Sequence, residues 1–247
     1  MLRIVKTENG LVRGLPGNNT RISVFKGIPF AQPPVGENRW KAPQPIGNWD
    51  GIRDCFKYGP IPYQDQPGVG TDIYCREWHV DPDIPREEDC LYLNVWTGAK
   101  SENDKLPVLV WIYGGGFQWG YSAEMEFNGE NLAKKGIIVV TVNYRLALMA
   151  NLAHPEITAE SPDAPCNFGL LDQQAGLHWV YENIAIFTFS NNPNRCFTMF
   201  FIRIYRIPSS FNPNFITTDF ITFFVEFVVY PFHTYLNFSI RSFLNFI

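Results

Sequence analysis

The chain has 247 residues, of which 46% are hydrophobic and 18% charged, so it can bury a sizeable core and is not a disordered protein. Its 20 Lys and Arg residues and 24 Asp and Glu residues give a formal net charge of −4. This mild acidity offers no basic face for a phosphate backbone, so nucleic acid is not an expected partner. No apolar run reaches the ~18 residues of a spanning helix, so no membrane span is expected.

The composition of the chain changes near residue 186. All 19 glycines lie at or before Gly176, whereas 15 of the 21 phenylalanines lie at or after Phe187. Helices favour Ala and Leu, and turns favour Gly, so residues 187–247 do not have the composition of an ordinary domain. We therefore expect a domain of residues 1–186, followed by a tail that is either poorly ordered or a translation of non-coding sequence.

The first eight residues include the charged Arg3, Lys6 and Glu8 and lack the apolar segment of a secretory signal. The cytoplasm is therefore the default expectation, and the five cysteines are expected as reduced thiols. A disulfide between Cys75 and Cys90 is the alternative if the protein is secreted by another route. No Cys or His spacing suits zinc, so no metal site is expected.

The first third of the chain has short strands and many turns. Residues 4–7, 11–13 and 22–28 are typical of strands, and the Asn-Gly pair at 9–10 predicts a turn between the first two. Antiparallel pairing fits this arrangement. Prolines and glycines across residues 30–85 exclude long regular elements there.

Longer apolar runs follow. Residues 91–96, 108–113 and 137–142 predict strands, and the last two are nearly continuous apolar runs of the kind that is buried on both faces of a sheet. A short helix is expected at 131–135 and a longer one at 170–184. Because a helix separates the last two strands, they predict a parallel α/β sheet.

The sequence Trp-Ile-Tyr-Gly-Gly-Gly-Phe at 111–117 places three glycines directly after a predicted buried strand. Glycines let the backbone bend with its N–H groups pointing outward, and such groups can form an oxyanion hole for acyl transfer. By themselves the three glycines favour a plain tight turn after the strand over an oxyanion hole.

Further motifs surround this glycine run. Residues 88–95 (Glu-Asp-Cys-Leu-Tyr-Leu-Asn-Val) precede it, whereas 142–146 (Val-Asn-Tyr-Arg-Leu), 167–173 (Asn-Phe-Gly-Leu-Leu-Asp-Gln) and 179–185 follow it. Together with the opening segment at 25–36, this series resembles the type-B carboxylesterase and cholinesterase family of α/β-hydrolases. The resemblance covers residues 1 to about 186. It implies an incomplete α/β-hydrolase fold, in which N-terminal antiparallel strands lead into a mostly parallel central sheet.

The resemblance also assigns roles in an oxyanion hole and in the wall of the active-site gorge. It makes Gly115 and Gly116 the oxyanion-hole donors, with Gly114 shaping the turn. Trp78 lies near the position of a gorge-wall tryptophan, although the spacing differs by roughly two residues. A partly buried surface tryptophan is the plainer interpretation.

Two ion pairs follow from the same resemblance. Arg39 would pair with Glu88, and Arg145 would pair with Asp172, so that both pairs organise loops around the gorge. The alternative is that these are solvated charges. The segment at 147–152 departs from the family, because relatives carry glycines there and this chain has none.

None of the three catalytic residues of the family is expected in this chain. Relatives place the serine in a Gly-x-Ser-x-Gly elbow after the helix that ends near Ala185, but residues 186–206 contain no glycine. A resumed register would place Arg203 near the nucleophile position. The acid and the histidine lie farther along in the family. The four histidines of this chain belong to no motif that places a nucleophile and an acid beside them, as a catalytic base would need. They are His79, His154, His178 and His233.

The resemblance implies hydrolysis of small-molecule carboxylic esters by complete relatives, without a cofactor, and an inactive chain as it stands. The alternative function is that of a non-catalytic, cholinesterase-like adhesion or binding protein. An incomplete sheet would leave the strand at 108–113 with an unpaired edge, so self-association or aggregation is expected.

Overall fold

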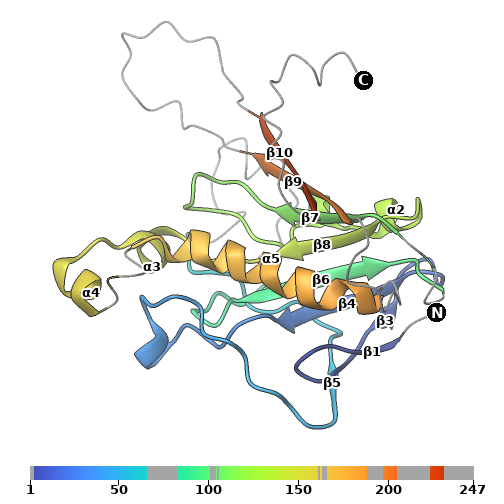
Figure 1. Ribbon diagram of the computed structural model, residues 1–247, viewed down its shortest axis with the longest axis horizontal. Helices are drawn as coiled ribbons and strands as arrows, with labels where there is room; N and C mark the ends of the chain where they lie inside the picture. Colours follow the sequence, from blue (N-terminus) through green and yellow to red (C-terminus); the bar gives the residue numbers. More distant parts are fainter. Residues whose placement is uncertain are drawn as a thin grey trace, which may run out of the picture.

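The computed structural model describes residues 3–65, 83–100, 104, 106–160, 162 and 166–187, together with the backbone of two strands at 197–204 and 223–230. A mixed sheet forms the centre, and the helix α5 (Phe168–Phe187) runs across one of its faces (Figure 1). No helix of the described residues is long and apolar enough to cross a membrane.

The central sheet has seven strands in the order β10-β9-β7-β8-β6-β4-β3. The bounds of these strands, in chain order, are Leu15–Pro16 (β3), Ser23–Pro29 (β4), Tyr92–Thr97 (β6), Val108–Ile112 (β7), Ile138–Val142 (β8), Phe197–Ile204 (β9) and Phe223–Tyr230 (β10). β7 pairs in parallel with β8, as its apolar run and the intervening helix predicted. The strands predicted at 91–96, 108–113 and 137–142 all form, each shifted or shortened by one residue.

The prediction of a mostly parallel sheet was wrong for the described strands. Only β7–β8 and β7–β9 pair in parallel, while β3–β4, β4–β6, β6–β8 and β9–β10 are antiparallel. The reason lies in β3 and β4, which join the central sheet and pair antiparallel within it. β6 lies between β4 and β8 and runs against both of them.

The predicted unpaired edge beside β7 was also wrong. The backbone of β9 pairs in parallel with β7 over four residue pairs, from Val108↔Met199 to Trp111↔Ile202, and β10 pairs antiparallel with β9. On this side the edge of the described sheet therefore lies at β10 and not at β7.

A second, small sheet is formed by β1 (Ile4–Lys6), β2 (Leu11–Arg13) and β5 (Ile52–Asp54). β1 and β2 pair antiparallel across the predicted turn, which the Thr7 N–H closes by donating to the Gly10 carbonyl at 2.8 Å. β5 pairs in parallel with β2 and was not predicted, because it is three residues long and lies in the proline-rich stretch.

The helices are α2 (Glu130–Ala133), α3 (Ala147–Asn151), α4 (Pro155–Glu160) and α5. The sequence predicted α2 and α5 but neither α3 nor α4, which are only five and six residues long. Two single 3₁₀ turns lie at Gly36–Asn38 and Met125–Phe127.

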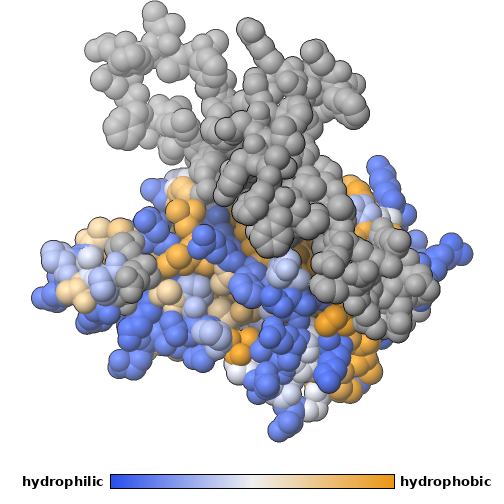
Figure 2. All heavy atoms as spheres, viewed as in Figure 1, coloured by the Kyte–Doolittle hydropathy of each residue, from blue (hydrophilic) through white to orange (hydrophobic). Residues whose placement is uncertain are grey.

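The core lies between the sheet and α5. All five residues of β8 are buried and β-branched, and four of them are apolar, as is typical of a strand buried on both faces. Phe187 at the end of α5 meets Phe25 of β4 edge-to-face at 5.1 Å. The face drawn in Figure 2 is largely polar over the described residues, with separate hydrophobic areas.

A carboxylate fixes the turn between β3 and β4 to α2. Glu130 is 6% exposed and accepts hydrogen bonds from the backbone N–H groups of Asn18 (3.0 Å) and Asn19 (2.7 Å). Burial alone would raise the pKa of Glu130, but these N–H groups and the Lys134 ammonium outweigh it, so the pKa is lowered.

Candidate functional site

The three glycines form a bent loop directly after β7. Gly115 and Gly116 have φ of +127° and +63°, which lie in the left-handed region that favours glycine. A Cβ atom on Gly115 would lie 2.1 Å from the Trp119 carbonyl oxygen, so the loop has no room for a side chain there. We call residues 114–120 the glycine loop.

The glycine loop presents two adjacent N–H groups that have no partner. Within the described part of the chain, neither the Gly115 nor the Gly116 N–H donates a hydrogen bond, and both residues are partly exposed. Two neighbouring N–H donors without a protein acceptor can bind an anion or a developing oxyanion.

A pair of tyrosines fixes the start of this loop. The Tyr113 hydroxyl donates to the Tyr144 carbonyl at 3.0 Å, and the Tyr144 hydroxyl donates to the Tyr113 carbonyl at 2.9 Å. Their rings stack at 4.5 Å. Burial raises the pKa of the Tyr113 hydroxyl well above its usual range, so it stays a neutral donor.

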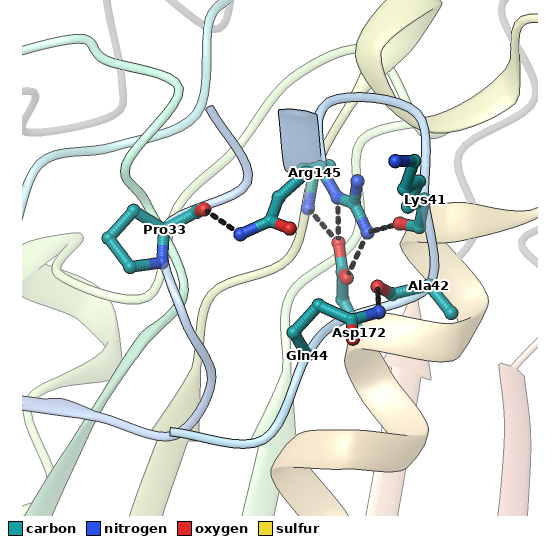
Figure 3. A network of polar contacts seen from close by, with 7 residues as sticks. Pro33, Lys41, Ala42, Gln44, Arg145 and Asp172 are labelled. Atoms are coloured by element: carbon teal, nitrogen blue, oxygen red, sulfur yellow. Dashed lines mark hydrogen bonds and ion pairs between the residues drawn. The ribbon is translucent and has the colours of Figure 1, made fainter. Parts of the chain in front are cut away.

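Arg145 and Asp172 form a buried ion pair that joins the loop after β8 to α5. The guanidinium donates from Nε to Oδ2 at 2.8 Å and from Nη2 to Oδ1 at 2.7 Å, while the Arg145 backbone N–H also donates to Oδ2 at 3.0 Å. Nη2 continues to the Lys41 carbonyl at 2.8 Å (Figure 3). The two side chains are 3% and 0% exposed. Burial raises the pKa of Asp172, and the Arg145 contacts oppose this shift.

Arg39 and Glu88 form a second, more exposed pair. Arg39 donates from Nε and Nη2 to the two carboxylate oxygens at 2.6 and 2.7 Å, and the side chains are 40% and 17% exposed. The hydrogen bond to Glu88 raises the pKa of Arg39. Arg39, Glu88 and Arg145 line one narrow pocket, so the two pairs lie next to each other in the fold.

Four of the residues singled out from the sequence lie outside the described residues: Cys75, Trp78, His79 and His233. Cys90 is a buried free thiol, and burial raises its pKa well above the usual range. His154 and His178 are exposed, as isolated histidines usually are.

The glycine-free segment after β8 keeps a glycine-like backbone. Ala147 has a φ of +50°, a conformation that L-residues adopt at a cost. Its N–H donates to the Phe117 carbonyl at 2.7 Å, which ties it to the glycine loop.

Sequence reasoning missed Gln64 and Asn143. The Gln64 side chain makes two hydrogen bonds with Gly120, and Asn143 accepts from the Ser122 N–H at 2.8 Å. Asn143 belongs to the motif at 142–146 but was given no role of its own, whereas Gln64 is a lone amide residue in an irregular segment and gives no sequence signal for its contacts.

The comparisons with known proteins agree with this geometry. The sequence model described as Carboxylesterase family matches residues 2–197, which extends past the predicted boundary at 186. The chain is 40% identical over 190 residues to the fumonisin B1 esterase of Sphingopyxis macrogoltabida, covering 76% of this chain and 33% of that protein. It is 43% identical over 198 residues to a cholinesterase of Mus musculus, covering 77% and 31%.

Solved structures of esterases also superpose on this chain. A PNB esterase superposes with a TM-score of 0.65 at 39% identity, covering 76% of this chain and 36% of its own. A carboxylesterase of Geobacillus stearothermophilus superposes with a TM-score of 0.66 at 36% identity, covering 81% and 38%. The chain spans about a third of the length of the curated relatives it matches. Because the family model matches residues 2–197 and the relatives are similar over about three quarters of the chain, the chain belongs to the carboxylesterase family.

Proposed function

We propose that this chain carries the oxyanion-hole part of a serine carboxylesterase and that the complete protein hydrolyses small-molecule carboxylic esters. The observation behind the proposal is that the Gly115 and Gly116 N–H groups have no acceptor among the described residues. During acyl transfer the carbonyl oxygen of the ester becomes negatively charged, and two preorganised N–H donors stabilise that charge. Loss of one such donor typically slows catalysis ~10²–10³-fold.

Ester hydrolysis fits what is known of the relatives by name, since the fumonisin B1 esterase and the cholinesterase are both esterases. The chemistry requires a serine nucleophile, a histidine that transfers its proton and an acid that orients the histidine. No step of this mechanism requires a metal or an organic cofactor.

We also propose that the 247-residue polypeptide does not hydrolyse esters by itself. Its sequence contains no Gly-x-Ser-x-Gly segment. In the backbone register of β9 and β7, position 203 directly follows the last pair, Trp111↔Ile202, at the end of β7 where the glycine loop begins. The residue there is Arg203, whose guanidinium stays protonated and cannot act as an acyl acceptor.

A chimaera tests the proposal. Residues 1–187 of this chain would be joined to the corresponding C-terminal part of PNB esterase, which supplies the nucleophile, the acid and the histidine. We expect the chimaera to hydrolyse p-nitrophenyl acetate and the 247-residue chain to stay at background. The control is the same chimaera with its nucleophilic serine changed to alanine.

Two results would contradict the proposal. A folded chimaera that a serine-directed phosphonate labels but that does not turn over ester would show that this glycine loop is no working oxyanion hole. Phosphonate-sensitive turnover by the 247-residue chain alone would show that it has its own nucleophile. No observation on the described residues favours the non-catalytic binding function.

A further inference from the structure

The glycine loop has an unusual backbone along most of its length. Gly115, Gly116, Phe117 and Gly120 all have φ between +62° and +127°. Such a run of left-handed conformations persists only where the surrounding structure holds it in place. The contacts that hold the loop therefore determine where its two free N–H groups point.

Two of these contacts come from the neighbouring strand end. Tyr113 and Tyr144 exchange hydrogen bonds at the start of the loop, and Ala147 donates its N–H to the Phe117 carbonyl at 2.7 Å in the middle. Both involve residues that follow β8, the parallel neighbour of β7. Asn143, which also follows β8, accepts from the Ser122 N–H at 2.8 Å just beyond the loop, but among the described residues none after β8 supports Gly120 by a bond to its N–H or carbonyl.

Gln64 supplies that support from a segment 56 residues away in the sequence. The Gly120 N–H donates to Gln64 Oε1 at 2.9 Å, and Gln64 Nε2 donates to the Gly120 carbonyl at 3.0 Å. The side-chain amide thus pairs with both polar backbone groups of one residue, as a strand neighbour would. The backbone of Gln64 is itself anchored, because Arg86 Nη1 donates to the Gln64 backbone carbonyl at 3.2 Å.

Close packing connects Gly120 to the two free N–H groups. A Cβ on Gly120 would lie 2.6 Å from the Gly114 carbonyl oxygen, and a Cβ on Gly115 would lie 2.1 Å from the Trp119 carbonyl oxygen. The two ends of the loop are therefore in contact. A shift of Gly120 therefore changes the packing against Gly114, and a shift of its neighbour Trp119 changes the packing against Gly115.

We propose that Gln64 is a positioning residue of the oxyanion hole, which holds the Gly115 and Gly116 N–H groups in place through its two hydrogen bonds with Gly120. This inference rests on the proposed function of those two groups. Gln64 itself touches neither the reacting atoms nor the two donors.

The sequence allows these N–H groups to be observed singly by NMR. The chain has only two glycines that follow a glycine, Gly115 and Gly116, and only one that follows a tryptophan, Gly120. With ¹⁵N-glycine and carbonyl-¹³C-glycine, an HNCO spectrum shows only Gly115 and Gly116. With carbonyl-¹³C-tryptophan it shows only Gly120. The full chain would be studied fused to a small soluble domain that lacks Gly-Gly and Trp-Gly pairs.

The test compares Gln64→Leu and Gln64→Glu with the control Gln44→Leu. Gln44 is a suitable control because its amide donates only to the nearby Ala42 carbonyl, at 2.8 Å (Figure 3). In Gln64→Leu we expect the Gly120 N–H to exchange with solvent roughly tenfold faster, and the Gly115 and Gly116 peaks to shift or split. Gln64→Glu keeps the acceptor, so it should retain Gly120 protection and show smaller shifts. Gln44→Leu should leave all three peaks unchanged.

Each other outcome would overturn the proposal. If Gly120 loses protection while the Gly115 and Gly116 peaks stay in place, Gln64 holds Gly120 alone. If Gln64→Leu unfolds the chain, Gln64→Glu takes its place in the test. A Gln64→Glu variant that loses Gly120 protection but keeps the Gly115 and Gly116 peaks in place would also show that Gln64 holds Gly120 alone. If the Gly115, Gly116 and Gly120 peaks of the unmodified chain had random-coil chemical shifts, the loop would not be ordered and the proposal would be refuted. Because no readout depends on ester turnover, a failure of the hydrolytic function is seen separately, in the chimaera.

Discussion

Replacing Asp172 by asparagine tests how much the buried ion pair stabilises the fold. The substitution keeps the shape of the side chain but leaves the Arg145 guanidinium, 3% exposed, without its counter-charge. It also sets an amide N–H₂ against the N–H donors that now bind the carboxylate. Breaking a buried pair in this way costs ~3–5 kcal/mol. That is a large part of the ~5–15 kcal/mol that stabilises a typical domain.

The chain offers a control with the same geometry and a different environment. Arg13 binds Asp54 through the same two-pronged contact, at 2.6 and 2.9 Å, but both side chains are 44% exposed. Water then solvates either partner after the other is removed, so Asp54→Asn should hardly change stability. The two pairs share the two-pronged side-chain contact and differ in burial and in the extra bond that Asp172 accepts from the Arg145 backbone N–H.

Urea unfolding, followed by tryptophan fluorescence on the soluble fusion, measures the difference. With a slope of ~3 kcal/mol per molar urea, Asp172→Asn should lower the midpoint by ~1 M or more. The double variant Arg145→Met, Asp172→Leu should recover much of this loss, because no unpaired charge is left inside. An Asp172→Asn midpoint no lower than that of Asp54→Asn would refute the reasoning.

Three further predictions concern the loop, acid stability and association. Gly115→Ala should destabilise the chain by ~1–2 kcal/mol or more, because a Cβ on Gly115 meets the Trp119 carbonyl. Gly47→Ala is the control, because a Cβ there meets nothing within 4 Å. Thermal melts of both variants measure the difference. The lowered pKa of Glu130 means that it stabilises the fold at neutral pH and that this contribution disappears as the pH falls below its ordinary value of 4.5. Glu130→Gln should therefore show a flatter acid limb in a pH series of unfolding midpoints, and a limb as steep as that of the unmodified chain would contradict the argument. Finally, no described strand pairs with the outer edge of β10, so the chain should self-associate there, and Val228→Lys should shift it toward monomer in light scattering. A monomer of the unmodified chain at tens of micromolar would contradict this.

The central strands and the long helix could be predicted because their sequence signals are local. β8 is a continuous β-branched run, and burial on both faces leaves no other pattern possible. The glycine loop could be located for a similar reason, since its neighbouring N–H donors need backbone conformations that glycine supplies.

The remaining features depend on contacts between distant segments. The position of β6 between β4 and β8 cannot be derived from any one strand, so the number of antiparallel pairs was underestimated. Gln64 contacts Gly120 across 56 residues, and a single glutamine has no periodicity that would mark it. Ala147 takes a left-handed conformation against its own preference because the backbone path there is set by Phe117.

The pairing of β9 with β7 separates what this fold needs from what ester hydrolysis needs. The outer edge of β7 has backbone N–H and carbonyl groups that any extended segment can satisfy, because ladder hydrogen bonds do not depend on side chains. A strand that follows α5 can therefore occupy that edge without a catalytic sequence. The nucleophile of an α/β-hydrolase, by contrast, sits on a sharp turn after its strand, and that turn needs glycines on both sides of the serine. No glycine follows Gly176 in this chain. Sheet formation beside the glycine loop is thus compatible with a sequence that has no Gly-x-Ser-x-Gly segment, which is why the chimaera, and not the order of the strands, tests the activity.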